Sequence, residues 1–310
     1  MKPFGSEKSN RENNRMQSEV INKPQKEKKV AGLVIFYNPP IEALANIRSY
    51  INQVKLLYVV DNSDQINFEI KSWLESQQSV EYIFNGNNMG IAEPINKTAV
   101  SAKNLGYNYL LTMDQDSFAP PELVDLLIDN FKSFKSVGIS CPWIVDKNFP
   151  GKSTRITSYE VDFCITAGSL ISLEAYSNVG GFNENFFIDY VDFEYCLKLK
   201  RNFFKIIKNP KAQLLHTVGE LKKWNIGPVS FYSTNHSPLR LYYRTRNRFQ
   251  LREIYKSDNK RFFKEDLINF FKEIGTIILA ETDKIQKMKM ILRGYMDFKK
   301  SRFGKFQEQI

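Results

Sequence analysis

The stretch YNYLLTMDQDSF, residues 107–118, sets two carboxylates directly after an apolar segment. Its tyrosines and leucines predict a buried β-strand, and the Pro-Pro pair at 120–121 marks the following turn. Asp114 and Asp116 stand one residue apart where this strand ends. Mutual repulsion and lost hydration disfavour two such charges unless a cation or a set of hydrogen-bond donors compensates them. The stretch therefore predicts a strand that ends in a ligand site.

Strand and helix signals alternate on both sides of this stretch. Apolar runs predict further strands, and helical patterns follow them, one closed by a glycine and one opened by prolines. A βαβα rhythm predicts an α/β fold with a Rossmann-like, mainly parallel sheet flanked by helices. The predicted strands are 30–39, 55–64 and 80–86, and the predicted helices are 92–106 and 120–134.

Polar residues collect where the predicted strands end. Asp61 and Asn62 follow the second strand, as Asp114 and Asp116 follow the fourth. Ligands of open α/β sheets bind at the carboxyl ends of the strands, so these side chains are expected to share one site. Asp-x-Asp suits a hard divalent cation, Mg²⁺ or Mn²⁺, with a diphosphate completing its ligands.

The second half of the chain has a less regular pattern. Residues 166–187 predict a short strand, a short helix and a Gly-Gly turn. Residues 189–201 predict a helix whose first turn is rich in carboxylates, as the helix dipole favours. Residues 204–217 predict two short strands separated by a Lys-Asn-Pro turn.

The net charge of +10 belongs to the ends of the chain. Residues 1–29 hold 8 Lys and Arg against 4 Asp and Glu, and residues 240–310 hold 18 against 9. Residues 30–239 hold 18 against 21. A slightly acidic body argues against a nucleic-acid groove, and we expect no nucleic acid as a partner. The basic ends are left to meet an anionic membrane surface.

Composition also divides the chain and suggests its compartment. Residues 1–29 predict a disordered polar tail without an apolar signal segment, residues 30–225 the α/β domain, and residues 226–310 a basic, mainly helical C-terminal extension. Three dispersed cysteines, without a CxxC pair, indicate reduced thiols and a cytoplasmic protein. Peripheral attachment to the inner face of the cell membrane is the alternative location.

Four segments, in this order and spacing, resemble the inverting nucleotide-sugar glycosyltransferases of family 2, which have the GT-A fold. They are VVDNSD (59–64), NGNNMGIAEPINKTAVSAKNLGYNYLLTMDQDS (85–117), TAGSLIS (166–172) and VGGFNENFFIDYVDFEYCLKLK (179–200). The Asp-Gln-Asp-Ser variant with NMGIAEPIN (88–96) is most similar to the bacterial rhamnosyltransferase branch. The resemblance implies transfer of L-rhamnose from dTDP-rhamnose to a saccharide or lipid-linked saccharide acceptor, in bacterial surface polysaccharide synthesis.

The resemblance also implies roles for single residues. Asp192 is the expected catalytic base, although Val191 stands where the family usually has the first member of an acidic pair, so Asp189 and Glu194 remain alternatives. A base and a bound metal would together support attack by a sugar hydroxyl. The expected metal ligands are Asp116, Asp114 and His216. The expected donor-binding residues are Phe36, Tyr37, Asn38, Asp61, Asn88, Gly90, Asn96, Asp114, Gly168, Ser169 and Arg244.

Purely structural roles are the alternatives for two of these assignments. His216 could be a structural residue at a strand end, and Arg244 with Arg246 could belong to a solvated basic helix face. A metal-dependent nucleotidyltransferase is an alternative function, but FYNPPIEA (36–43) lacks the glycine-rich phosphate loop with Arg and Lys that it needs. A basic nucleic-acid-binding protein, suggested by the pI of 9.3, is the other alternative.

One apolar stripe stands out in the C-terminal extension. Its residues recur at spacings of three and four, which predicts one face of an amphipathic helix. The stripe could pack against the body, against a second chain, or against an anionic membrane. Its members are Phe262, Phe263, Leu267, Phe270, Phe271, Ile274 and Ile278.

Overall fold

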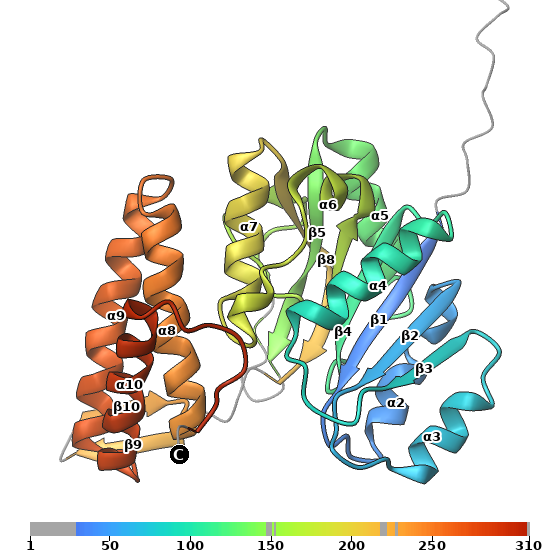
Figure 1. Ribbon diagram of the computed structural model, residues 1–310. Helices are drawn as coiled ribbons and strands as arrows, with labels where there is room; N and C mark the ends of the chain where they lie inside the picture. The colour runs from blue at the N-terminus through green and yellow to red at the C-terminus, as the bar shows by residue number, and fades with distance from the viewer. Residues whose placement is uncertain (1–28, 147–150, 152, 218–221, 227–228, 309–310) are drawn as a thin grey trace, which may run out of the picture.

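The computed structural model describes residues 29–146, 151, 153–217, 222–226 and 229–308 (Figure 1). The predicted polar tail therefore lies outside the described residues, apart from Lys29. Among the described residues, no helix is long and apolar enough to cross a membrane.

An eight-stranded sheet forms the centre of the first unit, as the strand pattern predicts. Its strand order is β3-β2-β1-β4-β7-β5-β8-β6, in which β7 and β6 run antiparallel to their neighbours and the others are parallel. The strands are β1 Val30–Phe36, β2 Leu56–Asp61, β3 Val80–Phe84, β4 Tyr109–Asp114, β5 Val137–Asp146, β6 Tyr159–Glu160, β7 Ser169–Ser172 and β8 Lys205–His216.

Helices cover both faces of this sheet because most strands are apolar on both sides. In β1, Ala31 and Leu33 face one core, and Val30 and Val34 face the other. The first core is closed by α4 Ala92–Asn104, α6 Leu173–Val179 and α7 Val191–Arg201 (Figure 1). The second is closed by α2 Ala43–Arg48, α3 Phe68–Glu75 and α5 Leu123–Ser133, and two short 3₁₀ turns, Ile51–Gln53 and Glu184–Phe186, complete the unit.

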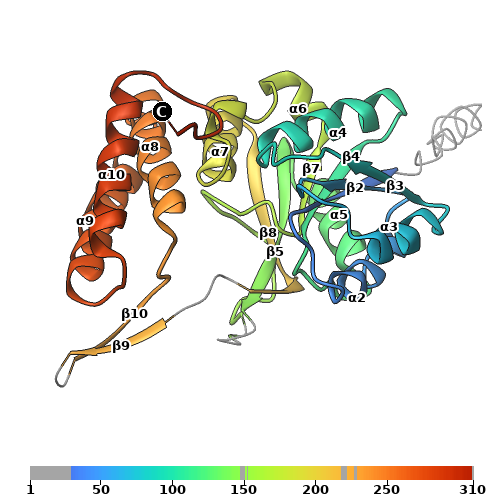
Figure 2. The ribbon, with the colours of Figure 1, turned by 60° about the horizontal axis from the view of Figure 1, so that its bottom comes forward.

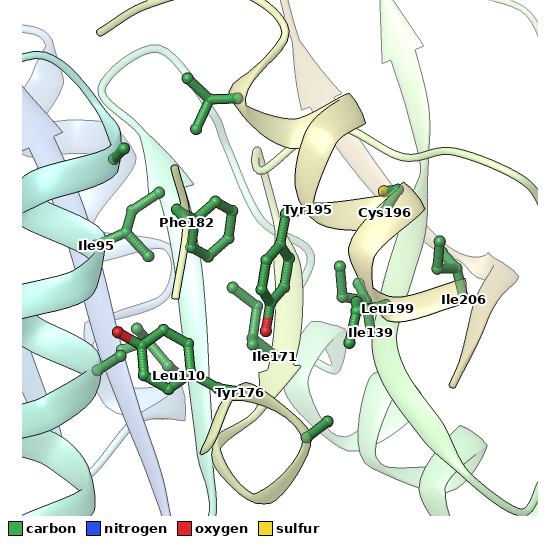
Figure 3. Packing of buried hydrophobic residues seen from close by; sticks show 14 of the residues in the cluster. Ile95, Leu110, Ile139, Ile171, Tyr176, Phe182, Tyr195, Cys196, Leu199 and Ile206 are labelled. Carbon is green, nitrogen blue, oxygen red and sulfur yellow. The ribbon is translucent and has the colours of Figure 1, made fainter. Parts of the chain in front are cut away.

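Aromatic packing fixes α7 on the first face of the sheet. The rings of Phe182 and Tyr195 stack with centroids 3.9 Å apart, above the aliphatic side chains of Ile171 and Leu110 (Figure 3). Leu199 of the same helix packs in this core. Because α7 runs opposite to the parallel strand β8 that follows it, the first turn of α7 lies at the carboxyl ends of the strands.

The C-terminal part of the chain is a hairpin followed by three helices. The hairpin pairs β9 Lys222–Ile226 with β10 Val229–Ser233, so the predicted boundary at 225 falls inside β9. Helices α8 Pro238–Tyr255, α9 Lys260–Leu279 and α10 Lys284–Lys299 then pack around Leu241, Phe270 and Ile291. In both ribbon views α8 lies between the sheet unit and the pair α9–α10 (Figures 1 and 2).

One secondary-structure prediction is wrong in its detail. Residues 204–217 form the single strand β8 and not two strands. The Lys-Asn-Pro turn survives only as an irregularity, where the register against β5 jumps between Asn209 and Gln213. Pairing with β5 continues on both sides of the jump, and this pairing keeps the segment in one strand.

Candidate active site

The predicted site residues gather where four parallel strands end. Phe36 ends β1, Asp61 ends β2, Asp114 ends β4 and His216 ends β8. Direct pairing of β1 with β2 and β4 brings the first three ends side by side. We refer to this rim as the carboxyl edge of the sheet.

Three of the predicted metal ligands meet at this edge. The His216 Nδ1 atom lies 3.1 Å from an Asp116 carboxylate oxygen, and its Nε2 atom lies 3.8 Å from Asp114 Oδ2. One ligand atom from each residue lies within 4.8 Å of the others. The two aspartate side chains are 47% and 42% exposed, so a ligand can reach them.

The β-strand pairing explains why His216 reaches the two aspartates. Phe118, just beyond the Asp-Gln-Asp sequence, pairs with Leu215 through backbone hydrogen bonds of 2.8 and 3.1 Å. Ser117 also lies 3.1 Å from His216 Nδ1. His216 is thus fixed at the carboxyl edge, at the end of β8 and beside Asp116.

The donor set of this group fits a divalent cation. Loss of surrounding water raises the pKa of Asp114, attraction to His216 opposes the rise, and repulsion from Asp116 adds to it. A cation bound between the two carboxylates would relieve that repulsion. Carboxylate oxygens with one imidazole nitrogen are ligands that Mg²⁺, Mn²⁺ and related ions accept.

The turns after β1 and β2 form the neighbouring wall. Asp61 accepts hydrogen bonds from the Ser63 amide (2.9 Å) and from the Tyr82 hydroxyl (2.7 Å). The Ser63 hydroxyl accepts one from the Asn38 amide. The Tyr37 amide donates to the Gln115 side chain, which links this wall to the Asp-Gln-Asp turn.

Phe36 of the predicted donor-binding turn reaches the carboxyl edge with its backbone. Its ring is completely buried in the core, so only its backbone faces the edge, where its carbonyl accepts from the Asn62 amide. Tyr37, the next residue, has an exposed side chain, because successive side chains of an extended segment point to opposite sides.

Gly90 joins the loop after β3 to the segment before α7. Its φ is +78°, its amide donates to Asn88 Oδ1, and its carbonyl accepts from the Asn62 side chain. A Cβ at this position would lie 2.4 Å from the Phe187 carbonyl oxygen. Only glycine fits there, so the contact between the two segments depends on this residue.

Three predicted donor-binding residues carry structural hydrogen bonds or close packing. Asn96 bonds the backbone of Phe182 and the carboxylate of Glu184. The Ser169 hydroxyl donates to the Ile165 carbonyl. Gly168 has a φ of +70°, and a Cβ there would lie 2.7 Å from the Leu214 side chain.

Asp192 lies in the first turn of α7, at the same edge. The two residues before the helix adopt left-handed backbone conformations, with φ values of +60° for Asp189 and +65° for Tyr190. Such conformations are uncommon outside glycine and often occur at functional sites. Burial raises the pKa of Asp192 to about 7, against the stabilising hydrogen bond from the Phe193 amide.

The two alternative carboxylates are already engaged. Asp189 pairs with Arg240 at 3.2 Å and with Arg244 at 3.7 Å. Glu194 is buried and accepts a hydrogen bond from the Tyr255 hydroxyl at 2.7 Å. Both carboxylates thus have partners within the protein, unlike a carboxylate that is placed to accept a proton from a substrate.

The alternative of a solvated basic face on α8 is wrong for Arg246. Arg246 is buried and donates to the carbonyls of Asn185 and Gly304. Arg244 lies 3.3 Å from Glu273 and also contacts Asp189, so it joins the segment before α7 to α9. Short-range sequence pattern carried no signal for these partners, which are 29 to 61 residues away.

Asn247 is a supporting residue that sequence reasoning missed. Its side-chain amide donates to three carbonyls, those of Phe186, Ile188 and Asp189, at 2.8 to 3.0 Å. It thereby holds the segment that leads into Asp192. Apart from this contact, two of the three dispersed cysteines lie close together, with the sulfurs of Cys164 and Cys196 3.9 Å apart.

Comparisons with known proteins agree with this arrangement. Residues 33–196 match the model of the family described as glycosyl transferase family 2. The chain is 28% identical over 244 residues to the dTDP-rhamnosyl transferase RfbF of Shigella flexneri, covering 72% of this chain and 79% of that protein.

Solved structures with the same fold are similar over most of the chain. GalNAc-T7 with UDP, GalNAc and Mn²⁺ has a TM-score of 0.56 and 13% identity, over 77% of this chain and 50% of that one. TarS of S. aureus, residues 1–349 with UDP-GlcNAc, has a TM-score of 0.51 and 15% identity, over 88% and 73%. These likenesses show the GT-A fold. With its family match spanning more than half of its residues, the chain belongs to glycosyl transferase family 2.

Proposed function

We propose that this glycosyltransferase moves L-rhamnose from dTDP-rhamnose to a saccharide or lipid-linked saccharide acceptor, with inversion at the anomeric carbon. The likeness to a dTDP-rhamnosyl transferase over most of both chains supports the donor. The reaction would serve bacterial surface polysaccharide synthesis, in the cytoplasm or at the inner face of the membrane. Residues 30–225 would form the transfer unit and residues 226–310 the extension.

One observation carries the proposal: a group of side chains that could hold a metal ion and the separate Asp192 carboxylate both lie at the carboxyl edge of the sheet. Asp114, Asp116 and His216 would hold Mg²⁺ or Mn²⁺ together with the donor diphosphate. When bound, the ion would offset the negative charge that develops on the departing diphosphate. Asp61 and the exposed Tyr37 ring would contact the nucleoside, beside the Gln115 side chain that links the Tyr37 turn to the Asp-Gln-Asp turn.

The role of Asp192 follows from its charge state and its surroundings. A base must lose its proton near neutral pH and still bind one well enough to take it from a hydroxyl. A pKa of about 7 meets both conditions. Asp192 would accept the proton of the acceptor hydroxyl as that oxygen attacks the sugar, so that a single displacement inverts the configuration.

The remaining predicted residues would act by shaping the site. Gly90, fastened to Phe187 and Asn88, would keep the loop after β3 close to the sugar. Gly168 and Ser169 would let the donor sugar approach the backbone, while Asn96 would hold the opposite segment. Arg244 would contribute through Asp189, whose position it fixes, more than by touching the donor.

A donor screen with the purified chain tests the proposal. Release of nucleoside diphosphate is measured with dTDP-rhamnose, UDP-N-acetylglucosamine and a GDP-sugar, each with Mg²⁺, with Mn²⁺ and with a chelator. We expect turnover with dTDP-rhamnose that the chelator abolishes. Turnover with another donor alone would overturn the rhamnosyl proposal, and full turnover in chelator would overturn the metal proposal.

A further inference from the structure

An exposed apolar surface lies on the C-terminal bundle, far from the sheet. Eight large apolar side chains of α9 and α10 are between 40% and 75% exposed. Soluble surfaces seldom gather so many in one place without a partner. We call these residues the outer face; they are Ile268, Phe271, Ile278, Leu279, Ile285, Leu292, Tyr295 and Met296.

Helical spacing brings the two halves of the outer face together. Ile274 of α9 and Met288 of α10 pack in the same core, at the seam between the two helices. Phe271 and Ile278 lie three residues before and four residues after Ile274, and Ile285 and Leu292 are related to Met288 in the same way. Positions three and four apart share one side of a helix, so both sets flank the seam.

Helix α9 therefore carries two apolar sides and not one. Phe263 is buried in the first core of the sheet unit, and Phe270 and Ile277 are buried in the core between the three C-terminal helices. Phe271 and Ile278, members of the same predicted stripe, stay exposed. In both ribbon views α9 and α10 stand on the side of α8 away from the sheet, so the sheet unit does not cover the outer face (Figures 1 and 2).

Most of the exposed charges around the outer face are basic. Three acidic side chains of these helices and Glu281 in the turn between them form ion pairs: Asp266 and Glu273 with Arg248, Glu281 with Lys287, and Asp297 with Arg293. Two acidic side chains are exposed, Glu265, which pairs with Arg261, and Asp283. Exposed lysines remain along both helices. They are Lys264, Lys272, Lys284, Lys289, Lys299 and Lys300.

We propose that the outer face docks on an anionic lipid surface. Exposed apolar side chains interleaved with lysines are the features of an interfacial helix, which inserts its apolar side between headgroups and attracts anionic lipid. A second copy of the chain fits less well, because it would set the lysines of one outer face against those of the other. The docking involves no residue of the carboxyl edge and is independent of the donor.

Vesicle co-sedimentation of the full chain tests this docking. The probes are vesicles of phosphatidylglycerol with phosphatidylethanolamine, and vesicles of phosphatidylcholine alone, at low and high salt. We expect binding to the anionic vesicles that is at least about tenfold weaker on phosphatidylcholine, and weaker at high salt, because salt screens surface charge.

Paired variants connect the binding to the outer face. Phe271→Ser with Leu292→Ser should abolish it, and Lys272→Glu with Lys289→Glu should abolish it on anionic vesicles. All four side chains are exposed, so the fold should survive. Phe68→Ser and Lys135→Glu, at exposed sites of the sheet unit, are the matched controls and should bind like the parent.

Two results would overturn the docking. One is absence of binding to anionic vesicles, or binding that the outer-face variants leave unchanged. The other is a dimer in sedimentation velocity that Phe271→Ser with Leu292→Ser dissociates while no vesicle binding is seen, which assigns the face to a second copy. Nucleoside diphosphate release in solution should be the same for parent and variants, so this result is read separately from the donor screen.

Discussion

The carboxyl edge and the C-terminal bundle treat charge in opposite ways. In the bundle, buried charges have partners of opposite sign, as with Arg248 beside Asp266 and Lys287 beside Glu281. At the edge, Asp114 and Asp116 repel each other, and burial makes Asp192 hard to ionise. Paired buried charges mainly specify packing, whereas unfavourable ones persist where a ligand or a reaction uses them. This difference supports the proposal that the reaction takes place at the edge, while the ion pairs of the bundle hold its helices together.

Replacing Asp192 should have the largest effect on the transfer rate. We expect Asp192→Asn to lower the transfer rate about a thousandfold, because the amide cannot accept the acceptor's proton. Donor affinity, measured by calorimetry with the nucleotide sugar and no acceptor, should stay near that of the parent. If donor binding is lost instead of transfer, Asp192 belongs to the donor site and is not the base.

Removing a metal ligand should have the next largest effect. Asp116→Ala should reduce metal-dependent turnover at least about a hundredfold, through loss of charge stabilisation on the leaving diphosphate. The side chain is 42% exposed at a strand end, so thermal unfolding should change little. Near-normal activity of the variant in chelator would refute the metal role of this edge.

The pH profile sharpens the difference between the two regions. Asp192 must be deprotonated to act, so a pKa of about 7 predicts that kcat/KM falls below neutral pH, about tenfold per pH unit. Because burial raises the Asp192 pKa from its ordinary value of 3.8 to about 7, the folded chain keeps this carboxyl protonated between those pH values, where the unfolded chain does not. Its contribution to stability is therefore lost as pH rises through that window. In Asp192→Asn both dependences should disappear, as rate profiles and unfolding at several pH values would reveal.

Removing the hydrogen bonds from α8 to the segment before Asp192 should have a moderate effect on the transfer rate. Asn247→Ala removes the donor for three carbonyls, which should cost about 1 to 3 kcal/mol of unfolding free energy. The transfer rate should fall several-fold while donor affinity holds, because only the approach to Asp192 is disturbed. Asn185→Ala is a nearby control, since Arg246 bonds its backbone and not its side chain. Unchanged kinetics in a destabilised Asn247→Ala variant would reduce the residue to a packing role.

The sequence predicts the residues of the carboxyl edge better than the contacts of the C-terminal bundle, for a physical reason. Asp61, Asp114 and Asp116 are visible because strand ends and their polar residues are local patterns, and parallel topology brings such ends together. The contact of Asn247 with the segment before Asp192 spans about 60 residues, and no periodicity signals it. Likewise the spacing of Phe270 and Phe271 predicts an apolar helix, but only the packed bundle decides that one is covered and the other exposed.

The smallest expected effect on transfer is that of replacing Glu194, which lies two residues from Asp192. Its burial is typical of a structural carboxylate. It is 2% exposed, its Oε1 accepts from the Tyr255 hydroxyl, and its Oε2 has no hydrogen-bond partner among the described residues. Glu194→Gln keeps that acceptor and removes the buried charge that lies 3.4 Å from the Lys198 ammonium, while Lys198 retains its bond to the Gly181 carbonyl. We expect transfer within about twofold of the parent, because the bond to Tyr255 anchors α7 whether the group is charged or neutral. The variant is also the matched control for Asp192→Asn, since both exchange a carboxylate for an amide in the first turn of α7. A loss of transfer in Glu194→Gln with unchanged thermal unfolding would move the base from the edge into the core, and the contrast between the two regions would fail.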